Sequence, residues 1–276
     1  MEPKKLSLQK NKLSGAECGA KMRDKLTLPP VGLGMWDYGG LLNPDHSRDH
    51  SELKAIEQAI SLGYRHFDTA EMYAAGHSEE LLGRALKGLN RSDFIITSKV
   101  KPENLSYRGI LTACDGSLRK LQTDYIDLYQ LHWPDRALNI FGGGLGLYKH
   151  YDLESIPIEE TLEVLEEIVK TGKVRHIGLS NETPWGLSEF LNVSEKKSYP
   201  RAQSVQNAYN LLNRNYETGM SEFFHRSEVG LLAYSPLAQG YLSGKYLDGK
   251  LPEGSRTKLF GRGQRYETPS AESAIR

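Results

Sequence analysis

The chain has 276 residues, of which 38% are hydrophobic and 25% are charged, and 35 Lys and Arg residues balance 35 Asp and Glu residues. This length suits one barrel-sized domain of about 250 residues, and the balanced charge argues against nucleic acid or an anionic membrane surface as a partner. No apolar run approaches the roughly 20 residues of a membrane span, and the amino end lacks the apolar core of a secretory signal. The two cysteines, Cys18 and Cys114, form no disulfide framework, so we expect a cytoplasmic protein.

Short apolar segments alternate with amphipathic segments after residues 1–27, which we expect to form an N-terminal extension or hairpin. The spacing of apolar residues predicts helices over 106–122 and 157–171. Strands are expected to begin near Val31, Arg65, Asp93, Asp124, Val174, Gln203 and Leu231. Alternating strands and helices predict a parallel sheet, and strand starts about thirty residues apart favour a TIM-type (β/α)8 barrel over an open α/β sheet.

Two longer connections follow the fourth and seventh expected strands, at residues 135–156 and 238–267. Both leave the strand ends at which barrel enzymes hold their chemistry, and loops of this length are usually functional or mobile. Only 40 residues follow Pro236, and a helix is expected to open at Pro269. We therefore expect residues 1–276 to form a single, incomplete α/β barrel of about seven parallel strands. It would lack the C-terminal βα unit and have low stability and weak cofactor affinity.

Four polar residues lie at or just past the ends of consecutive expected strands, namely Asp68, Tyr73, Lys99 and His132. The ends of adjacent parallel strands converge at one rim of a barrel, so these side chains can share a pocket. Reduction of a carbonyl creates a developing alkoxide, and a phenol donates its proton more readily when an ammonium lowers its pKa. A carboxylate can keep that ammonium charged, and an imidazole can hydrogen-bond the carbonyl oxygen. Each residue alone has a simpler structural explanation, but the four together predict carbonyl reduction.

Seven short motifs support this interpretation, and they occur in a fixed order between about Leu28 and about Arg256. In chain order they are GLGMW, DTAEMY, ITSKV, DYIDLYQLHWPD, HIGLSN, VQNAYN and LLAYSPLAQGYLSGKY. In this combination the chain resembles the aldo-keto reductase family. The resemblance implies an NADPH-dependent reductase of small aldehydes or ketones, with direct hydride transfer and no metal. It also implies Tyr73 as the general acid, Lys99 and Asp68 as the partners that lower its pKa, and His132 as the residue that orients the carbonyl.

The resemblance further implies which residues contact NADPH. Ser180, Asn181 and Gln206 would hydrogen-bond the nicotinamide carboxamide, and Tyr234 would stack on the nicotinamide ring. The other implied contacts are Met35, Trp36 and Asp68 on the nicotinamide side, the pyrophosphate loop of Ser235, Pro236, Leu237, Ala238 and Gln239, and the cations Lys245 and Arg256. The preference for NADPH over NADH rests on the resemblance alone.

Other interpretations stay open from the sequence. Lys99 at a barrel strand end also suits a Schiff-base aldolase. Residues 28–135 resemble the short-chain reductases, whereas residues 137–256 resemble the branch that contains potassium-channel β subunits. A non-catalytic regulatory or interaction module and an inactive fragment are therefore alternatives, and the difference between the halves fits either natural divergence or a deliberate chimera. The substrate and the oligomeric state are not predicted.

Two further patterns are weaker. The glycine run Gly142, Gly143, Gly144 and Gly146 lacks the spacing of a dinucleotide fingerprint, so we expect a flexible loop. His46 and His50 are four residues apart, like metal ligands on a helix. No third ligand is evident in the sequence, so we expect both histidines to be exposed to solvent.

Overall fold

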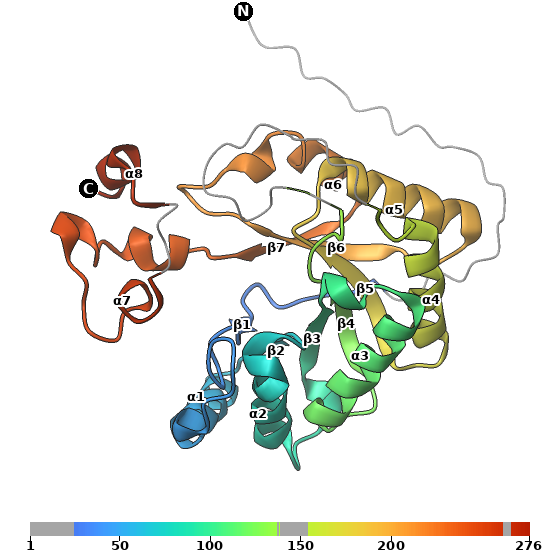
Figure 1. The fold of residues 1–276 in the computed structure, drawn as a ribbon, viewed down its shortest axis with the longest axis horizontal. Helices are drawn as coiled ribbons and strands as arrows, with labels where there is room; N and C mark the ends of the chain where they lie inside the picture. Colours follow the sequence, from blue (N-terminus) through green and yellow to red (C-terminus); the bar gives the residue numbers. More distant parts are fainter. Residues whose placement is uncertain (1–24, 137, 139–153, 262–265) are drawn as a thin grey trace, which may run out of the picture.

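The computed structural model describes residues 25–136, 138, 154–261 and 266–276. Within them a single sheet has the order β1-β2-β3-β4-β5-β6-β7, and all its strand pairs are parallel (Figure 1). The strands are β1 Leu33–Gly34, β2 His66–Asp68, β3 Ile95–Val100, β4 Ile126–Leu131, β5 Val174–Ser180, β6 Ala202–Ala208 and β7 Gly230–Tyr234. Each begins within two residues of its predicted start, so the seven predicted strands are confirmed.

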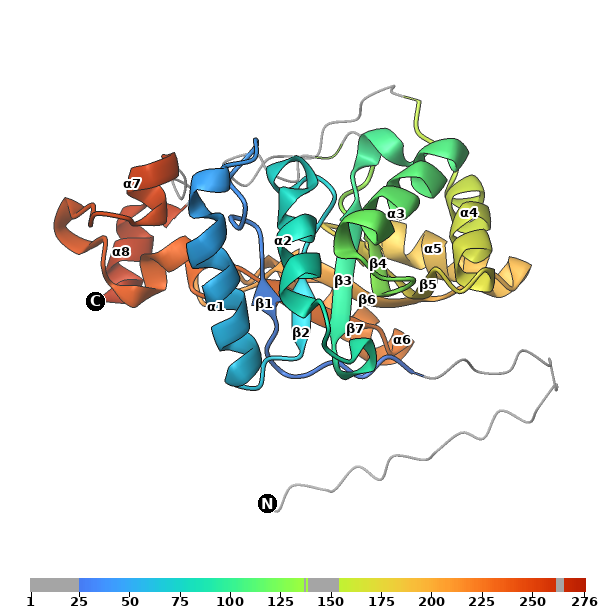
Figure 2. The ribbon, with the colours of Figure 1, turned by 90° about the horizontal axis from the view of Figure 1, so that it is seen from below.

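Helices lie between successive strands and after the last one. The helices are α1 Asp49–Ser61, α2 His77–Leu86, α3 Tyr107–Leu121, α4 Ile158–Lys170, α5 Pro184–Lys197, α6 Ser221–Ser227, α7 Arg256–Phe260 and α8 Pro269–Ile275. Helices α1 to α5 follow one another along one side of the strands (Figure 2). The predicted helices at 106–122 and 157–171 match α3 and α4 to within one residue at each end.

Helix α3 shows why these segments fold as they do. The hydroxyl of Ser106 accepts a hydrogen bond from the Gly109 backbone N–H at 3.3 Å and so caps the first turn. Apolar residues at helical spacing, among them Ile110 and Cys114, are buried against the sheet. Burial raises the pKa of the Cys114 thiol to about 12, so the cysteine serves as a small apolar core residue.

One hydrogen bond between distant strands shows that the sheet is curled. Gln206 in β6 donates from Nε2 to Oδ2 of Asp68 at the end of β2, at a distance of 2.7 Å. In a flat sheet these strands would lie about 19 Å apart, because neighbouring strands are spaced by about 4.8 Å. The expected incomplete barrel is therefore confirmed, and an open doubly wound sheet is excluded. Among the described residues, β1 pairs only with β2 and β7 only with β6.

The segment after β7 differs from the long loop predicted at 238–267. It contains short helical turns at Ala238–Ser243 and Leu247–Gly249, followed by α7. A second small core holds them together; its buried members are Ala238, Tyr241, Tyr246 and Tyr266. The helix predicted to open at Pro269 is confirmed as α8, which Thr268 caps through its hydroxyl.

Some predictions lie outside the described residues, namely those for residues 1–24 with Cys18, and for most of the 135–156 connection with its glycine run. Among the described residues, no helix is both long enough and apolar enough to cross a membrane.

Candidate active site

The four residues predicted to be catalytic lie together at the carboxyl ends of β2, β3 and β4. Asp68 ends β2, Lys99 lies near the end of β3, and His132 directly follows β4. The Lys99 ammonium donates to Asp68 Oδ1 at 2.5 Å, to the Thr69 carbonyl oxygen at 2.8 Å and to the Tyr73 hydroxyl at 3.3 Å. The rings of Tyr73 and His132 are in edge contact, with centroids 5.5 Å apart. A phenol, an ammonium, a carboxylate and an imidazole thus surround one point.

The charges of this cluster follow from burial and from mutual contact. Burial opposes the Lys99 ammonium, but the nearby Asp68 carboxylate and Tyr73 oxygen outweigh it and raise the pKa of Lys99. Burial raises the pKa of Tyr73, and the Lys99 charge lowers it by a smaller amount. Burial, assisted by the Lys99 charge, holds the pKa of His132 well below its ordinary value, so this imidazole is neutral.

The expected net lowering of the Tyr73 pKa is therefore wrong for this structure. Loss of solvation dominates, because the phenol is only 9% exposed. Lys99 acts in the predicted direction, whereas the Asp68 carboxylate acts against it and raises the pKa of Tyr73. At neutral pH the hydroxyl is consequently protonated, which is the form that a proton donor requires.

An unusual turn presents Tyr73 to the pocket. Ala74 and Ala75 have φ angles of 48° and 54°, and Gly76 follows with φ 95°. Left-handed conformations are unfavourable for alanine, so tertiary contacts impose this path. Gly76 suits its left-handed φ angle, and a Cβ atom there would also displace the end of the Lys120 side chain, whose ammonium nitrogen would lie 2.0 Å away.

The catalytic cluster opens into a cavity of about 450 Å³, a size typical of small-molecule sites. Predicted residues that line it are Trp36, Asp68, Tyr73, His132, Ser180, Asn181, Gln206, Tyr234, Ser235, Pro236, Gln239 and Arg256. Three further lining residues escaped the sequence analysis, namely Gly34, Met72 and Trp133. Met72 and Trp133 directly neighbour Tyr73 and His132 in the chain, and this proximity could have identified them as cavity residues.

Four of the predicted cofactor residues do not line this cavity. Met35 is fully buried in the main core. Ala238 is buried in the second core, and Leu237 is exposed on the surface. Lys245 is exposed beside the ring of Tyr246, with its ammonium nitrogen 5.2 Å from the ring centroid.

The opposite wall of the cavity is a hydrogen-bonded group from the ends of β5, β6 and β7. Asn181 adopts a φ of 54°, donates to the His132 carbonyl oxygen at 3.0 Å and accepts from the Tyr234 hydroxyl at 2.7 Å. The Ser180 hydroxyl donates to the Gln206 carbonyl oxygen at 3.1 Å. These contacts hold amide and hydroxyl groups at fixed positions facing the catalytic cluster.

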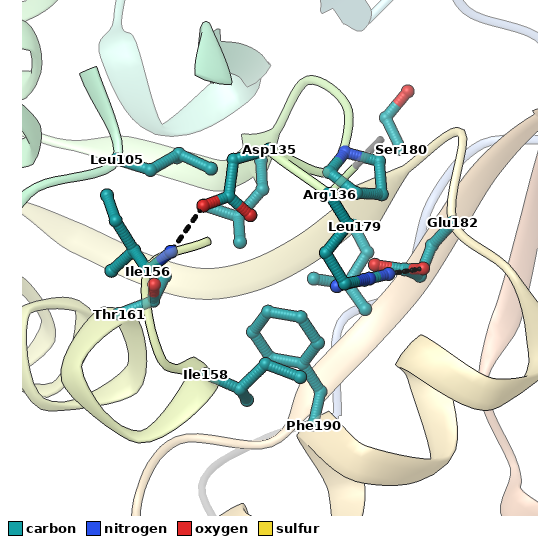
Figure 3. A pocket seen from close by; sticks show the side chains of 12 residues that line it. Leu105, Asp135, Arg136, Ile156, Ile158, Thr161, Leu179, Ser180, Glu182 and Phe190 are labelled. Atoms are coloured by element: carbon teal, nitrogen blue, oxygen red, sulfur yellow. Dashed lines mark hydrogen bonds and ion pairs between the residues drawn. The ribbon is translucent and has the colours of Figure 1, made fainter. Parts of the chain in front are cut away.

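An ion pair behind this wall anchors the start of the long connection after β4 (Figure 3). Arg136 Nη2 lies 2.5 Å from Oε1 of Glu182, whose carboxylate is almost completely buried. Beside it, Asp135 Oδ2 accepts a hydrogen bond from the Ile156 backbone N–H at 2.6 Å. The cavity that these residues line holds only about 10 Å³, too little for a substrate. This region therefore supports the site rather than binding a ligand.

Comparisons with known proteins agree with this geometry. The family model described as "Aldo/keto reductase family" matches residues 30–271. Protein tas of Escherichia coli K12 is 36% identical over 270 residues, which cover 91% of this chain and 76% of that protein.

Solved structures show the same relationship. The thermostable aldo-keto reductase Tm1743, solved with the inhibitor epalrestat, aligns with a TM-score of 0.67 and 31% identity over 90% of this chain and 94% of that one. An aldo-keto reductase from Klebsiella pneumoniae, solved in complex with NADPH, aligns with a TM-score of 0.64 and 32% identity over 80% and 68% of the two chains. With the strand-end cluster and the curled parallel sheet, these matches confirm the resemblance, and the chain belongs to the aldo/keto reductase family of oxidoreductases.

Proposed function

We propose that this chain reduces small aldehydes or ketones to alcohols by hydride transfer from NADPH, with Tyr73 as the general acid. The observation that carries the proposal is the contact of the Lys99 ammonium with both the Asp68 carboxylate and the Tyr73 hydroxyl at the floor of the cavity. A stability role alone would not require a buried lysine to face a phenol at an open cavity.

The residues around the cavity fit a nicotinamide cofactor. The cavity wall carries the amides of Asn181 and Gln206 and the Tyr234 ring, which suit a flat heterocycle with a carboxamide. Two buried polar atoms of lining residues, His132 Nδ1 and Gln239 Oε1, have no hydrogen-bond partner among the described residues. Such atoms are costly to leave unpaired, which favours a polar ligand beside them. When bound, NADPH would supply the hydride that the carbonyl carbon accepts.

The protein's own groups account for the proton and for orientation. The neutral His132 imidazole can donate one N–H to the carbonyl oxygen and so fix its position. As negative charge develops on that oxygen, the Tyr73 hydroxyl donates its proton to it. Lys99 stabilises the phenolate that remains, and Asp68 keeps Lys99 charged.

The geometry disfavours the alternatives from the sequence. A Schiff-base lysine must be neutral to attack, whereas Lys99 is fully buried, bonded to a carboxylate and raised in pKa. A non-catalytic module has no need for these four groups to converge at the floor of a cavity.

Replacement of Tyr73 by phenylalanine tests the proposal. General acid catalysis contributes about 10²- to 10⁴-fold, so we expect Y73F to lose that much aldehyde-dependent NADPH oxidation while NADPH binding, followed by fluorescence titration, is retained. Y129F is the matched control, because Tyr129 is a fully buried tyrosine whose hydroxyl has no partner among the described residues. Equal activity of Y73F and Y129F would refute the assignment of the general acid.

A further inference from the structure

A second cluster of ligand-type side chains lies apart from the cavity, where the turn before α1 meets the start of α2. His46 Nδ1 lies 3.7 Å from Asp49 Oδ2, and His77 Nε2 lies 2.6 Å from Asp49 Oδ1. The three potential ligand atoms all lie within 4.8 Å of one another. The sequence analysis singled out His46 but found no third ligand, because His77 is remote in the chain and reaches it only through the packing of α1 against α2.

The surroundings of His77 resemble the outer shell of a zinc site. Its second ring nitrogen, Nδ1, lies 3.0 Å from Oε2 of Glu80, and a carboxylate in this place fixes the orientation of a metal-binding imidazole. The His77 side chain is only 3% exposed, whereas that of His46 is 70% exposed. One ligand is thus rigid and buried, and the other can adjust from the solvent side.

The local charge also favours a divalent cation. Asp49 and Glu80 place two carboxylates at the cluster, and one cation, Arg84, contacts it directly. Arg84 Nη1 donates to Asp49 Oδ2 at 2.7 Å, which leaves Oδ1 as the oxygen that faces His77. With Oδ2 held by an arginine, Asp49 can offer a metal only Oδ1, which in the metal-free structure is hydrogen-bonded to His77 Nε2.

We propose that His46 Nδ1, Asp49 Oδ1 and His77 Nε2 form a Zn²⁺ site with a water molecule as the fourth ligand. Zinc bonds to nitrogen and oxygen of about 2.0–2.2 Å place tetrahedral ligand atoms about 3.3 Å apart, so shifts of about an ångström bring these atoms into position. On binding, the proton between His77 Nε2 and Asp49 Oδ1 leaves to solvent, and the metal takes its place.

Such a site would link two segments beside the active-site cavity, the loop after β1 and the turn before α2. Gly39 O accepts from the Asp45 backbone N–H at 2.7 Å, so the segment before His46 is tied to the loop that follows β1. His77 directly follows the turn that carries Tyr73. Zinc would therefore join this loop to the start of α2 and stabilise the fold.

The test measures zinc binding and thermal unfolding of the full chain. It uses a C18S background, because a thiol can bind zinc itself. Competition with a chromogenic chelator should show one zinc per chain, and the melting temperature should rise by several degrees in excess zinc relative to EDTA.

Variants decide whether the three residues are the ligands. H46A should bind zinc at least tenfold more weakly and lose the temperature shift, and it should fold normally because His46 is on the surface. H50A is the matched control, since His50 is an exposed neighbour outside the cluster, and it should behave as the parent. The proposal is overturned if the parent binds no zinc, if H46A binds as tightly as the parent, or if H50A loses as much affinity as H46A. None of these results depends on carbonyl reduction.

Discussion

Removal of the Arg136 charge should destabilise the protein, because the buried carboxylate of Glu182 would lose its opposite charge. In R136M, Glu182 would remain 5% exposed and would keep two hydrogen bonds from Thr183, from its backbone N–H at 2.7 Å and from its hydroxyl at 3.2 Å. Loss of one partner of a buried ion pair typically costs about 3–5 kcal/mol. Because two donors remain, we expect the free energy of unfolding to fall by about 2–3 kcal/mol.

The destabilisation should depend on pH in a defined direction. Burial already raises the pKa of Glu182, and Arg136 opposes this shift. Without Arg136 the folded-state pKa should rise further above the unfolded value, so the folded state takes up a proton as the pH falls. Stability lost at pH 7 should therefore be partly regained near pH 5.

Urea unfolding of R136M and of R214M at both pH values measures the effect. Arg214 pairs with Glu217 on the surface, so its removal should change stability little at either pH. Because Glu182 adjoins Asn181, R136M should also raise the KM for NADPH. Equal stability of R136M and R214M, or a loss of R136M stability that does not shrink at low pH, would refute the reasoning.

Two other predictions concern the catalytic lysine and the packing of helices. In K99M, the Tyr73 phenol loses the positive charge that lowers its pKa. The reduction rate should therefore drop, and its decline at alkaline pH should move to higher pH. A pH–rate profile measures both changes. In G83A, the new Cβ would lie 2.5 Å from the Lys120 carbonyl oxygen, so stability should fall by about 1–3 kcal/mol. G116A, in open space on the next helix, should instead gain about 0.5–1 kcal/mol in the same urea titration.

Periodicity and strand-end chemistry were enough to predict most of the fold and the catalytic cluster. The strands are short apolar runs between amphipathic helices, and this pattern is local in sequence. Asp68, Lys99 and His132 lie at the ends of three neighbouring strands, so parallel pairing alone brings them together. Their placement needed no knowledge of side-chain packing.

Features that depend on packing could not be predicted in this way. Met35 adjoins Trp36, but the first is buried in the main core and the second lines the cavity. The turn after Tyr73 uses alanines at positive φ, where sequence rules expect glycine or asparagine. The direction of the Tyr73 pKa depends on the balance of burial against one charge, and only coordinates reveal the degree of burial.

We expect the buried charge pair of the site to add little or nothing to the stability of the fold. Lys99 is fully buried, and Asp68 supplies its opposite charge. We expect D68N to lose about 3 kcal/mol at pH 7, because an ammonium remains without a counter-charge, and to recover as rising pH allows Lys99 to lose its proton. The double variant D68N/K99M removes the charge altogether and should be more stable than D68N, although inactive. If urea unfolding found D68N as stable as the parent, Asp68 would not be needed to offset the buried charge. If the double variant is also at least as stable as the parent, the pair is better explained by proton transfer at Tyr73 than by a contribution to folding.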